Sequence, residues 1–167
     1  LLETAVDEFL ETSEEHYDYV IIDCPPSLGL LVINAMCAVH EMLIPIQAEY
    51  YALEGLGQLI NTIGLVQEHF NPSLLVSTML ITMFDKRTLL SREVHDEVKN
   101  HYPTIVLNTT IPRTVKISEA PSFNQSVIAY DPKGMGAIAY CEAALEIARR
   151  SQTVLKLSLI HISEPTR

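Results

Sequence analysis

Glycine is scarce in this sequence of 167 residues, and none of its six copies forms a phosphate-binding loop. The pattern G-x-x-x-x-G-K-[ST], whose backbone N–H groups cradle phosphates, is absent. The six are Gly29, Gly55, Gly57, Gly64, Gly134 and Gly136. A phosphate site of that kind is therefore excluded for the sequence as it stands.

Cysteine motifs, hydrolase motifs and long apolar runs are missing as well. The three cysteines, Cys24, Cys37 and Cys141, form no C-x-x-C pair, so they indicate reduced thiols rather than disulfides or a zinc site. No H-E-x-x-H or G-x-S-x-G occurs, which leaves metalloprotease and serine hydrolase chemistry without support. No apolar run approaches the ~18 residues of a membrane span. No basic stretch precedes an apolar one at the start, so we expect no signal peptide.

Basic residues are few and unevenly placed. The net charge is -10, and the first 23 residues hold eight acids and no base. A hydrophobic content of 48% with a mean hydropathy of +0.19 nevertheless predicts a folded, globular, intracellular chain. Residues 86–116 carry six bases against three acids, and clustered bases can neutralise nucleic-acid phosphates. The bases of this segment are Lys86, Arg87, Arg92, Lys99, Arg113 and Lys116.

Short apolar runs alternate with helical patterns along residues 1–150. We predict strands at 19–22, 42–46, 74–83 and 104–107. We predict helices within 1–15 and at 27–39, 52–70, 89–101 and 137–150, with an irregular section from 112 to 122 before the apolar run at 127–130. Strands that are apolar on both faces and alternate with helices predict an α/β fold, a parallel sheet flanked by helices.

Residues 151–167 do not continue this pattern. Residues 154–162 alternate apolar and polar side chains like a strand, after a helix that already looks terminal. We predict that residues 1–150 form part of a larger domain and that residues 151–167 form a tail outside it that is disordered or artefactual. A short membrane-targeting or partner-binding tail is the alternative.

The sharpest local signal is Asp23, which follows the apolar run of residues 19–22 and precedes Cys24, Pro25 and Pro26. Open α/β sheets bind ligands at the carboxyl ends of their strands. In nucleotide-hydrolysing enzymes an aspartate at such a strand end helps to hold Mg²⁺. The alternative is an aspartate that only opens a turn before two prolines.

Several motifs together resemble the ParA/Soj family of partition ATPases, in one unbroken order over about residues 1–150. They are 20–29 (VIIDCPPSLG) with Asn34 and Ala35, 43–47 (LIPIQ) with Glu49 and Tyr50, 52–56 (ALEGL), 80–85 (LITMFD) with Arg87 and Thr88, 111–115 (IPRTV), 118–122 (SEAPS) and 130–134 (YDPKG). The resemblance implies the fold of P-loop NTPases. Members of the family begin with a phosphate-binding loop carrying two lysines, followed by an aspartate motif that positions the attacking water. Because this sequence holds neither, the resemblance implies the C-terminal part of a longer ATPase, which alone would be inactive.

The resemblance also assigns roles around a nucleotide. Asp23 corresponds to the Walker B aspartate, which holds Mg²⁺ through water. Met83 and Asp85 lie where the family forms part of its adenine pocket, and the segment with Pro112 and Arg113 corresponds to backbone contacts with the base. Core packing remains the alternative for Met83, and a solvated surface charge remains the alternative for Arg113.

By the same resemblance, Arg87 and Lys116 match basic positions that bind DNA non-specifically in the ATP-bound dimer. Lysine stands at 116 where arginine is more frequent in the family, but it still offers a point charge to phosphate. Arg92 and Lys99 lie at helical spacing from Glu93, Asp96 and Glu97, so we interpret them as ordinary surface charge balance.

The resemblance therefore implies an ATPase for chromosome or plasmid partitioning. It implies ATP and Mg²⁺ as cofactors, a homodimer formed with ATP, non-specific DNA and a ParB/Spo0J-like protein as partners, and a cytoplasmic, nucleoid-associated place in a bacterium, with no membrane partner. One alternative is a MinD-like membrane-associated ATPase, which would need a basic amphipathic C-terminal helix. The other is an interaction fragment without nucleotide turnover.

Overall fold

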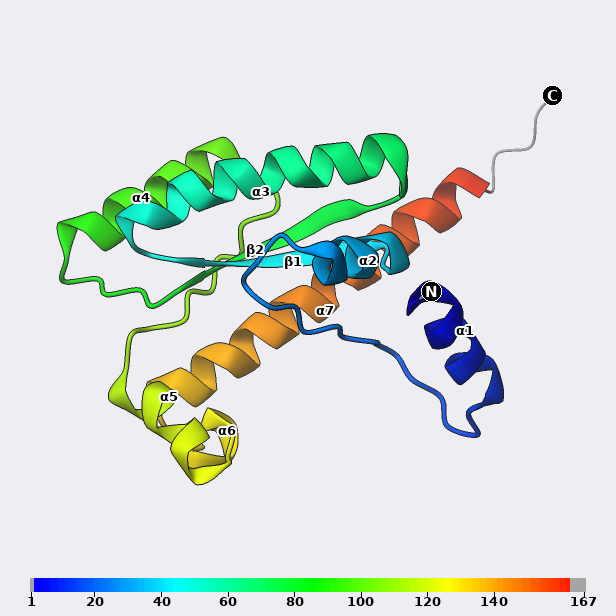
Figure 1. The fold of residues 1–167 in the computed structure, drawn as a ribbon. Coiled ribbons are helices and arrows are strands. Elements are labelled where there is room, and N and C mark those ends of the chain that lie inside the picture. The colour runs from blue at the N-terminus through cyan, green and yellow to red at the C-terminus, as the bar shows by residue number, and fades with distance from the viewer. Residues whose placement is uncertain (1, 163–167) are drawn as a thin grey trace. The chain divides into compact units, whose positions relative to one another are not determined.

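The computed structural model describes residues 2–162, with side chains described as far as Arg150. Helices and two neighbouring strands follow one another along the chain (Figure 1). The elements are α1 (Leu2–Thr12), α2 (Leu30–Ala38), β1 (Glu41–Gln47), α3 (Tyr50–His69), β2 (Leu75–Thr82), α4 (Leu89–His101), α5 (Val115–Glu119), the 3-10 helix η1 (Ala120–Phe123), α6 (Val127–Tyr130) and α7 (Met135–Ile162). The prediction of an α/β fold is confirmed.

The strands β1 and β2 are parallel neighbours in one sheet. The N–H of Leu75 donates to the carbonyl of His40 at 2.8 Å, and the N–H of Ala48 donates to that of Thr82 at 2.9 Å, so both chains run the same way. In β1 Ile44 and Ile46 are buried, while Leu43, Pro45 and Gln47, which alternate with them, are exposed. Pro45, which has no N–H, fits a strand with a single neighbour among the described residues.

The chain divides into two compact units, and both strands pass from one into the other. The first unit holds the residues up to Leu43 together with Leu53–Ser77. Buried residues of α2 and α3 form its core: Val32, Ala35, Met36, Leu56, Ile63 and Val66. The buried Asn71 donates to the carbonyls of Met36 at 2.9 Å and Val39 at 2.8 Å, so its amide ties the end of α2 to the turn after α3.

The predicted strand at residues 19–22 is wrong. This segment is irregular, and the side chains of Val20 and Ile21 are 48% and 88% exposed. A strand exists only when a neighbour completes its hydrogen bonds, and within residues 2–162 no strand pairs with this one. An apolar run indicates which side chains a strand would bury, but it carries no information on whether a neighbouring strand is present.

The second unit holds Ile44–Ala52 and the chain from Thr78 onward. Here Met79 of β2 pairs in parallel with Val106, and Phe84, which follows β2, pairs in parallel with Pro112. The predicted strand at 104–107 is thus reduced to a single bridge. Residues 78–81 of β2 are all buried, so the strand is covered on both faces.

Helices α4 and α7 cover the strand residues of the second unit, above and below them in Figure 1. Leu80, Leu107 and Ile111 pack with Ala139 and Ala143 of α7. On α4, Val94 and Val98 are buried, and the buried Ser91 donates its hydroxyl to the carbonyl of Ala48 at 3.2 Å. Thr88 caps the start of α4 by accepting from the N–H of Ser91. The predicted helix at 89–101 is confirmed.

The predicted irregular section is mostly short helices. Thr114 caps α5 and Ser126 caps α6 through their hydroxyl oxygens. The lack of a side chain at Gly136 lets Ile117 of α5 pack against the start of α7, because a Cβ at this position would lie 2.8 Å from Ile117 Cγ1. These caps and this close contact fix the position of Lys116.

The last helix extends beyond its predicted end at residue 150. Its backbone stays helical to Ile162, so the strand-like alternation at 154–162 was misleading. The prediction of a disordered or artefactual tail over residues 151–167 falls on the side chains of 151–162 and on residues 163–167, which lie outside the described residues. Among the described residues, no helix has the length and apolarity to cross a membrane.

Candidate functional site

The turn after β2 brings two of the predicted nucleotide-pocket residues together. Met83 has a φ of 53°, a left-handed conformation that few residues other than glycine adopt. That conformation ends the strand and leads into Phe84, Asp85 and the cap of α4. Asp85 therefore lies at the carboxyl end of a central strand, the edge at which parallel sheets bind ligands.

The segment with Pro112 and Arg113 lies directly beside this turn. The N–H of Phe84 donates to the carbonyl of Ile111 at 3.0 Å, and the N–H of Arg113 donates to the carbonyl of Phe84 at 3.0 Å. The N–H of Ile111 donates to the carbonyl of Ile81, and Pro112 has no backbone N–H. The stretch 111–113 therefore has no N–H left for a base, and because the Ile111 carbonyl already accepts from Phe84, the carbonyls of Pro112 and Arg113 are the ones it can offer. Carbonyl oxygens suit an exocyclic amino group such as that of adenine.

Glu49 holds the side chain of Arg113 in an ion pair, and both side chains are about half exposed. Glu49 follows β1, and Arg113 follows the segment paired with Phe84, so the pair lies at one sheet edge. The sequence reasoning missed this role. The signal was present, because a carboxylate right after a predicted strand is the pattern that singled out Asp23.

Asp85 and Arg87 form a forked pair in the same turn. Arg87 donates Nε to Oδ1 at 3.0 Å and Nη2 to Oδ2 at 2.8 Å, and its backbone N–H also donates to Oδ1. The side-chain hydrogen bond from Arg87 is the main cause that lowers the pKa of Asp85 to about 2, with a smaller effect of the Arg113 charge. Both oxygens of the predicted pocket carboxylate are thus engaged by the predicted DNA-binding arginine.

Lys116 lies on α5 and pairs with a carboxylate on the same helix. Its Nζ donates to Oε2 of Glu119 at 3.1 Å and lies 5.3 Å from the centre of the Tyr130 ring. The hydrogen bond that Lys116 donates to Glu119 raises the pKa of Lys116, so the side chain stays charged. The hydroxyl of Tyr130 also donates to Glu119, at 3.3 Å. Neither Glu119 nor Tyr130 was singled out from the sequence as a partner of Lys116.

Asp23 belongs to the first unit, where it lies on an exposed, irregular segment. The described residues contain no group of three His, Cys, Asp or Glu side chains that could hold a metal ion. A single carboxylate suits Mg²⁺, which usually keeps several waters and takes its other ligands from substrate phosphates. Asp23 is therefore compatible with a water-linked Mg²⁺ but makes no metal site by itself.

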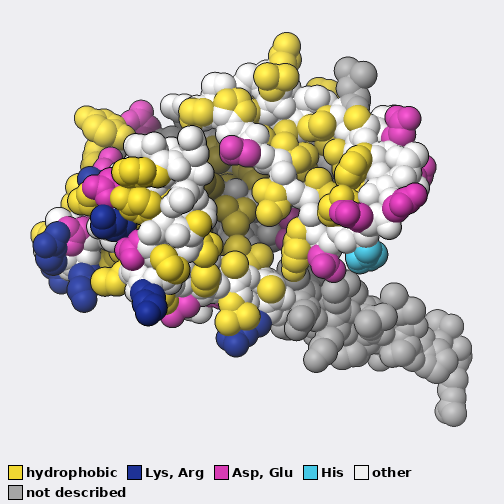
Figure 2. Space-filling view, turned by 90° about the horizontal axis from the view of Figure 1, so that it is seen from below, with side chains coloured by type: hydrophobic (Ala, Val, Ile, Leu, Met, Phe, Trp, Pro, Cys, Tyr) yellow, Lys and Arg dark blue, Asp and Glu magenta, His cyan; other side chains and the backbone are white. Residues whose placement is uncertain are grey.

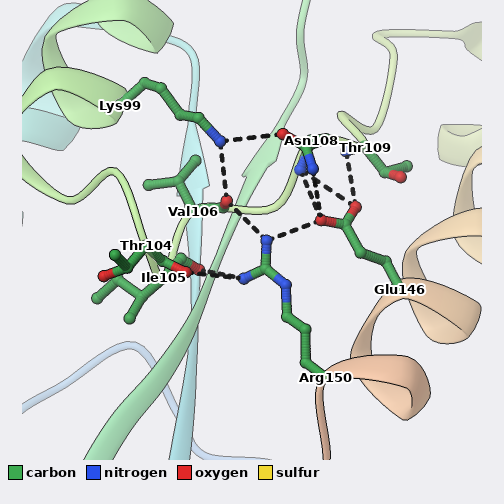
Figure 3. A network of polar contacts seen from close by, with 8 residues as sticks. All are labelled: Lys99, Thr104, Ile105, Val106, Asn108, Thr109, Glu146 and Arg150. Atoms are coloured by element: carbon green, nitrogen blue, oxygen red, sulfur yellow. Dashed lines mark hydrogen bonds and ion pairs between the residues drawn. The ribbon is translucent and has the colours of Figure 1, made fainter. Parts of the chain in front are cut away.

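A polar network fixes residues 104–109 against α7 (Figure 3). Glu146 accepts from the N–H groups of Asn108 and Thr109 at 2.9 and 3.0 Å, and Arg150 donates to the carbonyls of Ile105 and Val106. Burial alone would raise the pKa of Glu146, but these N–H donors, the Thr109 side chain and the Arg150 charge together lower it. The network anchors the chain that continues directly into Ile111–Arg113.

Comparison with known proteins gives matches over most of the chain. A family model described as an AAA domain matches residues 2–76. The chain is 51% identical over 146 residues to the sporulation initiation inhibitor protein Soj of Bacillus subtilis, covering 87% of this chain and 58% of Soj. It is 48% identical over 134 residues to the chromosome partitioning protein ParA of Myxococcus xanthus, covering 80% and 47%.

A solved structure is similar as well. The cobyrinic acid a,c-diamide synthase of Mycobacterium smegmatis, with bound ADP and magnesium, matches with a TM-score of 0.69 and 37% identity, over 90% of this chain and 53% of that one. In each comparison this chain spans about half to three-fifths of the other protein's length.

Proposed function

Since the chain belongs to the ParA/Soj family of partitioning ATPases, we propose that it contributes the base-binding and DNA-binding parts of an ATP-dependent partitioning protein. The observation that carries the proposal is the 51% identity to Soj over 146 residues. The sheet edge of the second unit supports it, because Met83, Asp85, Pro112 and Arg113 are brought together there.

Each unit holds residues that fit one part of ATP or its ion. In the second unit the carbonyl oxygens of Pro112 and Arg113 suit the amino group of adenine, and in the first unit Asp23, taken by itself, suits a water-linked Mg²⁺. The loop that would hold the phosphates is absent from the 167 residues. Bound Mg²⁺ would neutralise charge on the transferred phosphoryl group. We therefore propose that these residues bind and orient the base and the ion, and that hydrolysis requires a phosphate loop supplied in addition.

In the proposed function, ATP drives dimerisation and the dimer binds DNA without sequence preference. Arg87 is 84% exposed and Lys116 is 54% exposed, so phosphates can approach both. A ParB/Spo0J-like protein would stimulate hydrolysis and release the DNA. The protein would act on the bacterial nucleoid, for a chromosome or a plasmid.

The test requires the ATP-dependent state, which a chimera provides. In it, residues 1–150 replace the matching part of Bacillus subtilis Soj, whose remaining part supplies the rest of the protein. We expect Arg87→Glu with Lys116→Glu to abolish binding to a random duplex at low salt, because each change reverses one charge that faces phosphate. ATP-driven dimerisation, measured by analytical sedimentation, should persist in this variant.

The matched control is Arg92→Glu with Lys133→Glu, which makes the same change in charge at other exposed bases. We expect it to leave most of the DNA affinity intact. An unchanged affinity in the Arg87/Lys116 variant, or an equal loss in the control, would reject the assignment of these two residues to DNA.

A further inference from the structure

Arg87, the arginine assigned to DNA, is already bound to a carboxylate in the free chain. Its guanidinium donates from Nε and Nη2 to the two oxygens of Asp85, at 3.0 and 2.8 Å. Asp85 is only 19% exposed, whereas Arg87 is 84% exposed. A forked pair of this kind has defined geometry as well as charge. The carboxylate thus takes up one bidentate edge of the guanidinium, Nε with Nη2, and leaves three of its five N–H donors for a phosphate that shares the pair.

The pair also cancels charge at the point where DNA would approach. A phosphate that binds Arg87 must displace the carboxylate or share the guanidinium with it, and the displaced carboxylate then repels the phosphate. Lys116 differs, because its ammonium makes one hydrogen bond to a carboxylate that is 41% exposed. Lys116 keeps two of its three donors and Arg87 keeps three of its five, so the difference lies in the single hydrogen bond and in the more exposed partner carboxylate of Lys116.

We propose that Asp85 masks Arg87, so that the DNA affinity of this protein is set below what its bases alone would give. The proposal rests on the proposed DNA-binding role of Arg87. It assigns Asp85 to tuning of DNA binding, which is a role separate from contact with a nucleotide base. Asp85 acts through Arg87 and touches no DNA itself.

Asp85 also shapes the turn, and the choice of variant takes this into account. Its Oδ1 accepts from the backbone N–H of Arg87 at 3.0 Å, and its carbonyl accepts from the hydroxyl of Thr88 at 3.1 Å. Asp85→Asn keeps the shape and an Oδ1 acceptor, and removes only the charge. Alanine at this position would remove the turn contact as well and is less informative.

The experiment measures affinity for a short random duplex as a function of salt, in the chimera saturated with ATP and Mg²⁺ and in the 167-residue chain. Asp85→Asn should tighten binding about two- to fivefold at low salt, because that factor corresponds to the free energy that opening an exposed ion pair costs. The slope of log affinity against log salt should steepen by up to about 0.9. In the parent protein the Asp85 carboxylate that DNA displaces takes up cations and offsets part of the counterion release, whereas the neutral amide of Asn does not. A change limited to folding would not steepen this slope.

Two further variants separate masking from net charge. Glu93→Gln removes one exposed acid from α4 and should give a smaller gain. In an Arg87→Gln background, Asp85→Asn should lose its specific gain, because no guanidinium remains to be released. If Asp85→Asn binds no more tightly than Glu93→Gln, or more weakly than the parent protein, the masking proposal is wrong.

The outcomes also separate this proposal from the one on which it rests. If Arg87→Gln weakens binding and Asp85→Asn does not strengthen it, Arg87 contacts DNA but is not masked. If Arg87→Gln and Lys116→Gln both leave the affinity unchanged, the DNA-binding assignment itself fails, and the masking proposal fails with it.

Discussion

At the scale of single residues, Met83 is the clearest case of a backbone conformation that costs free energy next to a candidate site. Its φ of 53° is left-handed, and an L-residue pays roughly 1–2 kcal/mol for that conformation. The two flanking hydrogen bonds between Phe84 and the 111–113 segment hold the turn in place. The Asp85–Arg87 pair follows Met83 directly in this turn.

This cost predicts a difference between two substitutions of similar volume. Met83→Ile should lower the free energy of unfolding by about 1–2 kcal/mol more than Met83→Leu, because a β-branched side chain tolerates positive φ poorly. Urea unfolding followed by circular dichroism measures both. The control is the same pair of changes at Met42, a strand residue of β1, where isoleucine should be no worse than leucine. Equal stabilities at position 83 would contradict the argument.

The charged side chains of the site act in pairs. Arg113 is bound to Glu49, Arg87 to Asp85 and Lys116 to Glu119. All three pairs are at least partly exposed, so each adds little to stability. Their importance lies in which atoms they leave available to a ligand. A list of bases along the sequence does not contain that information.

At the scale of elements, α7 is joined to residues 104–109 by a carboxylate and a guanidinium one helical turn apart. Glu146 accepts from two backbone N–H groups, and Arg150 donates to backbone carbonyls and to Glu146 at 2.8 Å (Figure 3). Residues 104–109 make only one bridge to β2, so these side chains replace the hydrogen bonds that a longer strand would provide. The apolar packing of α7 on Leu107 and Ile111 reinforces the contact.

The lowered pKa of Glu146 predicts how stability depends on pH. Its folded value lies below the ordinary 4.5, so the carboxylate stabilises the fold fully above about pH 4.5. This contribution is lost as the pH falls through the lower folded value. Glu146→Gln should cost about 1–3 kcal/mol at neutral pH, and the difference from the parent chain should shrink in acid.

Urea titrations at a series of pH values test this prediction. The control is Glu142→Gln, an exposed change one turn earlier on α7, which should shift stability little at any pH. A loss for Glu146→Gln that stays constant down to strongly acid pH would show that shape, and not charge, matters at this position.

At the scale of the whole molecule, the chain exposes many large apolar side chains. Ile21, Leu30 and Leu31 of the first unit are 88%, 85% and 75% exposed, and Tyr51 and Val115 of the second are 79% and 70% exposed. Figure 2 shows hydrophobic side chains among the charged ones on the face that it presents. Exposed large apolar side chains that lie next to one another, as those of Leu30 and Leu31 do in the sequence, favour association.

We therefore expect the 167-residue chain to self-associate with rising concentration. Sedimentation velocity should show larger species, because an apolar surface and an edge strand such as β1 attract further copies. Leu30→Gln with Leu31→Gln should reduce the association, while Leu65→Gln, an exposed change on α3, should reduce it less. A monomer at all concentrations with one cooperative thermal melt would contradict this expectation.

The sequence predicted most elements of this fold because their periodicity is local. The helix at 89–101 was predicted to the residue, and the strands at 42–46 and 74–83 agree closely with β1 and β2. Among the predicted strands, the failures are at 19–22 and 104–107, where the pattern is apolar but the ladder is missing or reduced to one bridge. Hydrogen bonds between strands join residues far apart in sequence, so no local pattern reports them.

The site divides in the same way. The sequence by itself determined the family, the order of its motifs and the residues at strand ends, because these follow from residue type and spacing. Only the tertiary structure decided that Arg113 faces Glu49, that Lys116 faces Glu119 and Tyr130, and that Arg87 is engaged by Asp85. Charge partners are set by side-chain direction and by chain reversals, and these are fixed only when the elements pack.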